Sequence, residues 1–423
     1  MKRLSKSKVL FLSFGDYPHS GACVSLIRKL AAQEGFHNAA EVHVLAPRYN
    51  FSQTDTEIID GVTVHRFLCW DTISQQRLRQ RFPRAPLSTL SGVLQKATLR
   101  VRREYFKRDF LDSFTIRSIS RALASLSNEA FDVLIPVAGY YDSVQAAMRF
   151  MQHHPARLII YQVDPCSSNQ AFDAHTSKKR RTFERRMYAQ ADAVITTPIL
   201  LRELRNTVSD DLLKKAVAME FPNVSPKHDK GSNEQRQCTG DYVCVFAGSI
   251  YSQARNPAYT FKLFFMLREK HIRLRMIGVE KKAAAVYVKN GALSDNVEFY
   301  GTVPLEQAQK HMEEADVLIN IGNIMTNQVP SKIFEYISSG KPIVNICTSH
   351  DCPTQPYLEK YPYVLNLFEC DTDFDAQVQK LEAFIKENAG KRVSADYIMQ
   401  TYEKCTAQYC AKQMIDVIKR VVE

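Results

Sequence analysis

The sequence predicts an α/β protein built from two Rossmann-like, doubly wound parallel sheets, one in each half of the chain. Three observations lead to this prediction. Short apolar runs of strand length alternate with amphipathic stretches of helical length along most of the chain. A single polar segment containing prolines and glycines interrupts this alternation near the middle. The chain of 423 residues is also too long for one ordinary hydrophobic core.

The first half opens with a continuous apolar run at 8–14 (KVLFLSF), followed by the loop GDYPHSGA and a helical stretch at 23–33. Further runs predict strands at 41–46, 62–67, 131–137, 157–162 and 193–196. Strands this apolar, separated by helices, are typical of parallel sheets covered on both faces. We therefore expect an N-terminal domain over residues 1–222.

The segment 223–240 has little to bury and is predicted to be a linker. After it, apolar runs predict strands at 242–247, 273–278, 297–300, 317–321, 342–347 and 363–367. Helical stretches lie between them, around 257–270, 280–290, 304–314, 331–339 and 374–388. We expect a second domain over 241–395. The remaining 396–423 form a helical tail that no strand follows, so it can pack elsewhere.

The composition, with 45% apolar and 24% charged residues, excludes wholesale disorder. No apolar run approaches the ~18 residues of a membrane-spanning helix. The opening MKRLSKSKVLFLSFGD imitates a signal peptide, but its apolar stretch is short and lacks a cleavage site, so a strand is expected. Among the ten cysteines none forms a C-x-x-C pair, and Cys244 and Cys347 lie inside apolar runs. We expect buried thiols, no metal site and a reducing cytoplasm.

Glycine is scarce, so its positions are informative. Gly15, Gly21, Gly248, Gly278 and Gly301 each follow a predicted strand. Doubly wound sheets bind ligands outside the carboxyl ends of their strands, and there the backbone must turn sharply or approach the ligand closely. These glycines therefore indicate binding loops in both domains.

The most informative segment is 317–347, which predicts a strand, a polar loop, a helix starting near Ser331 and another strand. A helix N-terminus at the end of a parallel strand attracts phosphate. Lys332 lies in the first turn, where it opposes the helix dipole unless an anion is bound. Glu335, one turn later, can accept hydrogen bonds from ribose hydroxyls. The alternative is that Lys332 and Glu335 form a surface ion pair of i,i+3 spacing.

The sequence PSKIFEYISSGKPIV at 330–344 resembles the nucleotide-binding segment of the group 1 (family 4-like) glycosyltransferases of GT-B fold, in a variant of bacterial cell-surface polysaccharide enzymes. The family pattern is a glutamate, seven residues and a second glutamate. Glu335 matches the second, which the resemblance implies to bind the ribose. Asn327 stands where the first, sugar-contacting glutamate is usual. Its amide can still bind hydroxyls.

Other segments resemble the family in order and spacing. VFAGSIYSQARNP matches the first strand and loop of the second domain. The resemblance implies that Gly248 and Ser249 form the turn and that Arg255 meets the donor diphosphate. RMIGVE and NVEFYGTVP, with Gly278 and Gly301, resemble the strand ends that frame the nucleotide base. GDYPHSGA, DGVTVHR and FPNVSP match the family's opening strands and linker.

Departure of a nucleoside diphosphate leaves negative charge on its oxygens, and fixed positive groups lower that barrier. Arg255, Lys332 and the helix beginning at Ser331 suit this role without a metal. A D-x-D metal motif has one candidate, Asp371-Thr372-Asp373, but it directly precedes a helix, where aspartate is a preferred cap. We therefore predict metal-independent transfer. We expect no cofactor other than the nucleoside-diphosphate sugar, which serves as co-substrate.

The acceptor side offers fewer candidates. Family members often carry a histidine after the strand that corresponds to 131–137, but AGYYDS, with Tyr140, follows it here. His19 in the first loop and Asp164 after the strand at 157–162 remain as candidate catalytic side chains, and a carboxylate there can accept the acceptor proton. The alternative is that Asp164-Pro165 begins a turn and His19 bonds locally.

The net charge of +11 indicates an anionic partner. A basic insertion at about 72–110 holds most of it, and KKRRTFERR at 178–186 adds a second cluster. Basic amphipathic segments attract anionic lipid. A solvated cationic face is the alternative, and nucleic acid is not expected because no binding module accompanies the charge. The residues expected to contact the membrane are Arg100, Arg102, Arg103, Lys107 and Arg108.

The sequence thus predicts a GT-B hexosyltransferase. Its second domain is expected to bind a donor sugar nucleotide, and its first a lipid-linked or oligosaccharide acceptor. The resemblance implies retention of anomeric configuration and a role in cell-surface polysaccharide synthesis. The expected location is the cytoplasm, peripheral at the inner face of the membrane. A non-catalytic GT-B protein that binds a sugar nucleotide or glycan is the alternative function, since the family histidine is missing and Asn327 replaces a glutamate.

Overall fold

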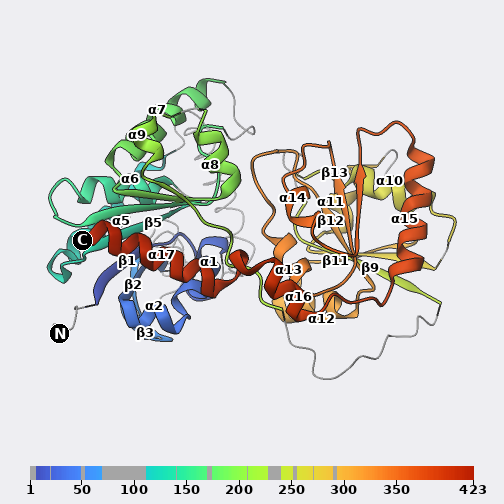
Figure 1. Ribbon diagram of the computed structural model, residues 1–423, viewed down its shortest axis with the longest axis horizontal. Helices are drawn as coiled ribbons and strands as arrows, with labels where there is room; N and C mark the ends of the chain where they lie inside the picture. Colours follow the sequence, from blue (N-terminus) through green and yellow to red (C-terminus); the bar gives the residue numbers. More distant parts are fainter. Residues whose placement is uncertain are drawn as a thin grey trace, which may run out of the picture. The chain divides into compact units, whose positions relative to one another are not determined.

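The protein divides into two compact units in the computed structural model (Figure 1). The first comprises Met1–Pro222 with Ala407–Glu423, and the second Asn223–Thr406. The structure describes residues 6–19, 21–48, 53–68, 111–139, 141–168, 174–206, 208–226, 240–250, 255–269, 271–288 and 293–423. The basic insertion predicted at about 72–110 lies outside these residues.

The first unit contains a sheet of eight strands in the order β3-β4-β2-β1-β5-β6-β7-β8. Every neighbouring pair is parallel except β3 with β4. The apolar runs form these strands as predicted, but β3 and β8 had no recognised signal because they are short edge strands. The bounds are β1 (Ser7–Leu12), β2 (Ala40–Arg48), β3 (Thr56–Ile59), β4 (Val62–Leu68), β5 (Val133–Ala138), β6 (Arg157–Gln162), β7 (Ala193–Thr196) and β8 (Ala216–Ala218).

Helices bury both faces of this sheet. On one face Ile119, Val144 and Met187, from three successive helices, join a core cluster with Leu10 and Leu134 of the strands. On the other, Phe36 packs against Phe11 with ring centroids 6.1 Å apart. The helices are α1 (Ala22–Ala31), α2 (Glu34–Ala39), α5 (Ser113–Ser125), α6 (Tyr141–Phe150), α7 (Ala174–Gln190), α8 (Pro198–Leu204) and α9 (Asp210–Leu213), with a 3₁₀ turn η1 (Ser127–Glu129).

The second unit has a wholly parallel sheet of six strands in the order β11-β10-β9-β12-β13-β14. The strand order reverses between β9 and β12, which is the switch point where doubly wound sheets bind ligands. Its strands are β9 (Tyr242–Ala247), β10 (Ile272–Ile277), β11 (Val297–Gly301), β12 (Val317–Ile321), β13 (Ile343–Cys347) and β14 (Val364–Phe368).

The helices of this unit follow the predicted stretches. They are α10 (Ala258–Met266), α11 (Lys281–Ala285), α12 (Leu305–Glu314), α13 (Lys332–Ser338), α14 (Gln355–Leu358), α15 (Phe374–Asn388) and α16 (Ala395–Thr401). The start of α15 was predictable from its N-cap residue. The carboxylate of Asp373 accepts a hydrogen bond from the amide of Ala376 at 2.9 Å. The capping role predicted for Asp373 is confirmed. α11 is shorter than the stretch 280–290.

A row of asparagines crosses the buried part of this sheet. Asn320, Asn345 and Asn366 occupy matching register positions on β12, β13 and β14. The amide of Asn320 donates to Oδ1 of Asn345 at 2.7 Å, and the amide of Asn345 donates to Oδ1 of Asn366 at 2.8 Å. Thr354 also donates to Asn345. The row is internally satisfied, which makes its burial tolerable.

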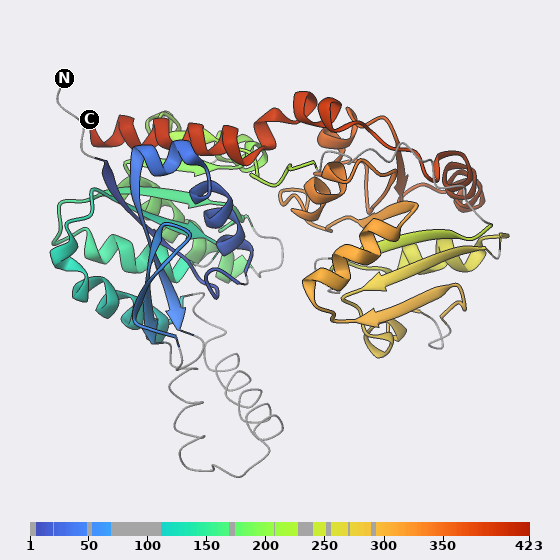
Figure 2. The same cartoon turned by 90° about the horizontal axis from the view of Figure 1, so that it is seen from below.

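The C-terminal segment 396–423 is divided between the units. α16 contacts α13 in the second unit. After a 3₁₀ turn η3 (Glu403–Cys405), α17 (Ala407–Val422) lies in the first unit against α1 and α2 (Figure 2). Cys410, Met414 and Val417 of α17 are buried there. The chain therefore passes between its units twice, once after Pro222 and once before Ala407.

One cysteine prediction was wrong. Cys347, expected to be a buried thiol, forms a disulfide with Cys352, with Cα atoms 6.0 Å apart. The short loop after β13 turns back on itself and brings the two residues together, which the apolar run PIVNIC did not reveal. Within the described residues, no helix combines the length and the apolarity needed to cross a membrane.

Candidate functional site

Glycines pack closely at the carboxyl edge of the second sheet, where β9, β10 and β11 end. The amide of Gly278 donates to the carbonyl of Gly301 at 2.7 Å, and that of Gly248 donates to the carbonyl of Ile277 at 3.0 Å. Gly278 has a φ of +87°, and a Cβ on it would lie 2.7 Å from the carbonyl oxygen of Gly248. Only glycine fits there. We call this closely packed backbone of Gly248, Gly278 and Gly301 the glycine floor.

Arg255 lies above this floor and spans the switch point. Its guanidinium donates to Oδ1 of Asn323 at 3.0 Å and to the carbonyl of Ser249 at 3.3 Å. A Cβ on Gly248 would lie 3.3 Å from the same guanidinium. Asn323 in turn donates to the carbonyl of Gln328 at 3.2 Å. A cation from the loop after β9 is thus held by the loop after β12.

The helix α13 borders the same edge. The hydroxyl of Tyr336 accepts a hydrogen bond from the amide of Ala247, the last residue of β9, at 3.0 Å. Burial raises the pKa of Tyr336 to about 12, and the nearby positive charge of Arg255 opposes that rise. Both observations place the first turns of α13 beside the end of β9. The interaction with Arg255 also places Tyr336 of α13 near this cation.

The first turn of α13 carries the predicted polar residues. Ser331 is the N-cap residue, and Lys332 donates to Glu335 at 2.6 Å. This is the i,i+3 ion pair that the sequence left open as an alternative. It does not exclude nucleotide binding, because a partly exposed pair of this kind is worth little and its members can exchange partners. Asn327, at the predicted sugar-contacting position, is only 3% exposed.

In the first unit, Asp164 lies where the loops after β5 and β6 meet the start of α1. A Cβ on Gly139, after β5, would lie 3.3 Å from the Oδ2 atom of Asp164, after β6, and 3.0 Å from the sulfur of Cys23 in α1. Burial, and then the negative charge of Asp164, raise the pKa of Cys23 to about 12. Cys23 therefore stays a neutral thiol. The carboxylate of Asp164 is an acidic group at this carboxyl edge.

A buried network fixes the main chain at Asp164. The hydroxyl of Tyr141 donates to the carbonyl of Asp164 at 2.8 Å, and the amide of Gln162 donates to the Tyr141 hydroxyl at 3.2 Å and to Glu184 at 3.3 Å. Ser167 also donates to Glu184. The main-chain carbonyl of Asp164 is consequently held by hydrogen bonds from two buried side chains. The chain bends at Asp164 and turns at Ser167 and Ser168, in agreement with the alternative that Asp164-Pro165 begins a turn.

The loop after β1 carries His19, Gly15 and Gly21. His19 is exposed, and its amide donates to the carbonyl of Asp16. Gly21 has a φ of +117°, and a Cβ on it would lie 3.4 Å from the Cα of Gly15. Arg66 on β4 donates to the carbonyl of Tyr17 at 2.9 Å and anchors the loop. Gly15 and Gly21 thus lie close together where the loop reverses direction.

Some predicted residues fall outside the described part of the chain. These are Tyr140 of the acceptor-side loop and the five membrane-contact residues Arg100, Arg102, Arg103, Lys107 and Arg108. The second basic cluster is described and lies on α7, where Lys178, Lys179, Arg181 and Arg185 are exposed. Sequence reasoning missed Asn323 and Tyr336. A signal existed only for Asn323, a polar residue two positions after the buried strand β12.

Residues 241–354 match the family model for group 1 glycosyl transferases. The matched segment contains the glycine floor, Arg255, Asn327 and the α13 pair. The second unit thus contains a segment similar to the group 1 glycosyl transferases. The predicted family resemblance and the predicted enzyme class, a glycosyltransferase, are confirmed by this match.

Solved glycosyltransferase structures share the fold of the whole chain. Sucrose-phosphate synthase of Thermosynechococcus elongatus is 13% identical and has a TM-score of 0.68, over 98% of this chain and 99% of that one. HepE of Anabaena, solved with UDP and glucose, is 11% identical with a TM-score of 0.62, over 98% and 100%. The lipopolysaccharide outer core galactosyltransferase WaaB is 12% identical with a TM-score of 0.55, over 98% and 99%. No curated protein sequence matches.

These structures confirm the predicted fold class, an α/β protein of GT-B architecture. At these identities they show the fold alone. The glycosyltransferase assignment rests on the family match to the second unit, which is also where the glycine floor and Arg255 lie.

Proposed function

We propose that this glycosyltransferase transfers a hexose from a nucleoside-diphosphate sugar to a lipid-linked or oligosaccharide acceptor in cell-surface polysaccharide synthesis. The observation that carries the proposal is the position of Arg255. It is a cation held over a glycine floor, at the switch point of a parallel sheet, by Asn323 and the Ser249 carbonyl. That arrangement suits a diphosphate, because the charge is fixed before the ligand arrives.

In the proposed reaction, Arg255 stabilises the leaving diphosphate more than Lys332 does. When the bond from the anomeric carbon to the diphosphate breaks, negative charge grows on the leaving oxygens. A guanidinium already oriented by two hydrogen bonds stabilises that charge without reorganising, and such groups are typically worth several kcal/mol. Lys332 adds a second positive charge once it leaves Glu335 for the diphosphate, and Glu335 is then released to accept from the ribose hydroxyls. We propose transfer without a metal and with retention of configuration.

Two kinds of observation support a nucleotide sugar as the donor: the residues of the site and the ligands of structures with the same fold. Asn327 has an amide at the position expected to face the sugar, and Gly278 packs beside Gly248 at the strand ends where the base is expected. Solved structures of HepE from Anabaena, of the same fold, contain UDP-glucose or UDP and glucose. WaaB is a galactosyltransferase. These relatives support a hexose donor for this chain.

For the acceptor, we propose Asp164 as the general base, with His19 as a further polar group in the first unit. The exposed basic residues of α7 support a membrane-associated acceptor, since each positive charge near an anionic lipid surface is worth about 1 kcal/mol. Peripheral attachment at the cytoplasmic face would place the enzyme where a lipid-linked acceptor is found.

The donor site is tested by calorimetric titration of nucleoside diphosphates. Arg255→Ala and Lys332→Ala should each weaken binding, Arg255→Ala by about 100-fold, and Arg255→Lys by less. Arg273→Ala is the matched control, because Arg273 is a half-exposed arginine of the same unit that pairs with Glu298 on β11. Undiminished binding by both site variants would overturn the assignment.

Turnover separates this proposal from a non-catalytic GT-B protein. A panel of nucleotide sugars is incubated with the enzyme and released nucleoside diphosphate is measured, with EDTA present to remove divalent metals. Slow hydrolysis of one donor that Arg255→Ala abolishes would support transfer. Tight donor binding without release, with or without acceptor glycans, would favour the non-catalytic alternative.

A further inference from the structure

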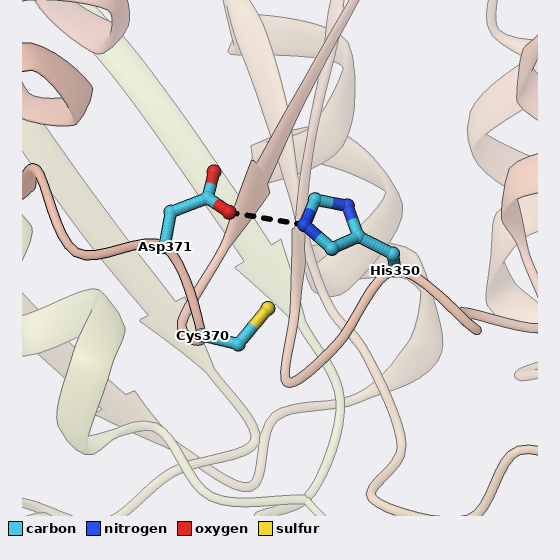
Figure 3. A group of neighbouring side chains, drawn as sticks. All are labelled: His350, Cys370 and Asp371. Carbon is cyan, nitrogen blue, oxygen red and sulfur yellow. Dashed lines mark hydrogen bonds and ion pairs between the residues drawn. The ribbon is translucent and has the colours of Figure 1, made fainter.

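A second group of chemically reactive side chains lies in the second unit, at the ends of β13 and β14. His350 belongs to the loop after β13, and Cys370 and Asp371 belong to the loop after β14. Their ligand atoms all lie within 4.8 Å of one another. Figure 3 shows the imidazole and the carboxylate joined by a hydrogen bond, with the thiol of Cys370 directed to the same space. We propose that these residues form a binding site for a divalent transition-metal ion, with Zn²⁺ as the best match.

The donor set fits zinc. Imidazole nitrogen, thiolate sulfur and carboxylate oxygen are the usual zinc ligands, and three of them with water in the fourth position complete a tetrahedron. Bond lengths of about 2.0–2.3 Å put zinc ligands about 3.3–3.8 Å apart. Nε2 of His350 and Oδ1 of Asp371 are 3.0 Å apart, and the thiol is within 4.8 Å. Small side-chain rotations therefore suffice to enclose the ion.

The two loops are held in place before any ion binds. The Cys347–Cys352 disulfide closes the loop that carries His350. The amide of Glu369 donates to the carbonyl of Cys347 at 2.8 Å and joins the two loops. The imidazole of His350 packs on Phe368, with ring centroids 4.1 Å apart. A ligand set supported in this way loses little conformational entropy on binding.

The local charge also favours a cation. The two loops contain Asp351, Glu369, Asp371 and Asp373 and no lysine or arginine, although the chain as a whole carries +11. The effect reaches Tyr259, whose pKa is raised to about 12 first by burial and then by the negative charges of Asp371 and Glu369. Asp373 is engaged at the cap of α15, so Asp371 is the aspartate of the D-x-D motif that faces His350.

A hydrogen-bonded histidine–aspartate pair by itself is not a metal site, and the protein contains a matched example. Nδ1 of His271 lies 2.9 Å from Oδ1 of Asp241, and the His271 side chain is 66% exposed, as is that of His350. The His271 pair has no cysteine in its group. Within the described residues, the group at His350 is the one in which three such ligands meet.

The test titrates the purified full chain with Zn²⁺ alone, in competition with a chromophoric indicator, and with Co²⁺ as a spectroscopic probe. We expect one Zn²⁺ per chain and a near-ultraviolet thiolate-to-cobalt band. His350→Ala and Cys370→Ser should each weaken Zn²⁺ binding by more than about 100-fold, since even loss of a residue that only supports a ligand costs 10–100-fold. Cys370→Ser should also remove the cobalt band, while His271→Ala should change neither.

Asp371→Asn is a control for misfolding. It removes the charged ligand but keeps the size of the side chain and one hydrogen bond. It should fold as the parent does, by thermal unfolding, and bind Zn²⁺ more weakly. Equal Zn²⁺ affinity of the parent and Cys370→Ser, or equal effects of His271→Ala and His350→Ala, would overturn the proposal. No nucleotide enters these measurements, so their outcome is independent of the proposed transferase function.

Discussion

The guanidinium of Arg255 donates a hydrogen bond to Oδ1 of Asn323 at 3.0 Å. The two residues follow β9 and β12, the strands on either side of the switch point. Asn323 therefore orients the cation that we propose to meet the donor diphosphate, although it need not touch the donor itself. It is a positioning residue.

Asn323→Ala should weaken nucleoside-diphosphate binding by about 10-fold, or about 1.4 kcal/mol, since the charge of Arg255 remains but its orientation is lost. Calorimetric titration measures the loss. Arg255→Ala should make the binding insensitive to a second change at Asn323, because the two act through one contact. Additive losses in the double variant would show that Asn323 acts independently of Arg255.

Substitutions of glycine should separate folding from binding. Gly278→Ala should lower the free energy of unfolding by about 2 kcal/mol or more, because it forces a side chain into a φ of +87° and against the Gly248 carbonyl. Gly35→Ala is the control, since Gly35 lies in α2 with open space around its Cβ position, and it should stabilise by about 0.5–1 kcal/mol. Denaturant titration distinguishes the two. A neutral Gly278→Ala would contradict the close packing of the floor.

Alanine substitutions in the asparagine row should lower the free energy of unfolding by unequal amounts. Asn345→Ala should cost about 3 kcal/mol, because Asn345 is fully buried and its loss removes the partner of Asn320, Thr354 and Asn366. Asn366→Ala, on the edge strand β14, removes one of these bonds and should cost about 1 kcal/mol. Urea unfolding of both variants checks this order, and equal costs would argue against a cooperative row.

The first unit should lose stability in mild acid through His65. Nε2 of His65 lies 2.9 Å from Nδ1 of His43, and burial, then the charge of His43, lower the pKa of His65. As the pH falls below about 6.5, the unfolded chain binds a proton that the folded chain does not, so the free energy of unfolding decreases until the folded-state pKa is reached. Above about 6.5 this contribution is constant.

Thermal unfolding measured between pH 7.5 and pH 5 tests this dependence. His65→Gln should be less stable than the parent at pH 7.5, because the buried pair is broken, but it should lose less stability on acidification. His271→Gln, at an exposed histidine, serves as the control and should follow the parent. The same loss on acidification in the parent and His65→Gln would refute the role of His65.

Much of the fold was predictable because the buried parallel strands are unusually apolar. β6, β7, β9 and β12 have the bounds that the sequence predicted. β3 and β8 were missed because edge strands bury little, and α17 could not be assigned to the first unit because its apolar stripe fits any apolar surface. Gly248, Gly278 and Gly301 were identifiable since few residues tolerate such backbone conformations.

The site was predictable only where residue type limits the role. Arg255 follows a strand in a known pattern, so its place at the sheet edge could be expected. The partnership with Asn323 depends on the spatial order of β9 and β12, which adjacent sequence does not encode. The disulfide of Cys347 and the meeting of His350 with Asp371 likewise arise from loops folded toward each other, and short loops carry little periodic signal.

The return of α17 to the first unit limits how the chain can be cut. Val417, Met414 and Cys410 complete an apolar surface on α1 and α2, although some 180 residues of the second unit separate α17 from Pro222. A fragment ending at the linker would lack that cover and should aggregate. Conversely, a protease nick between 227 and 239 should leave both pieces associated, since the final helix keeps the downstream piece docked on the upstream one. Expression of the isolated first half thus requires its terminal helix, supplied in trans or fused through a short connector.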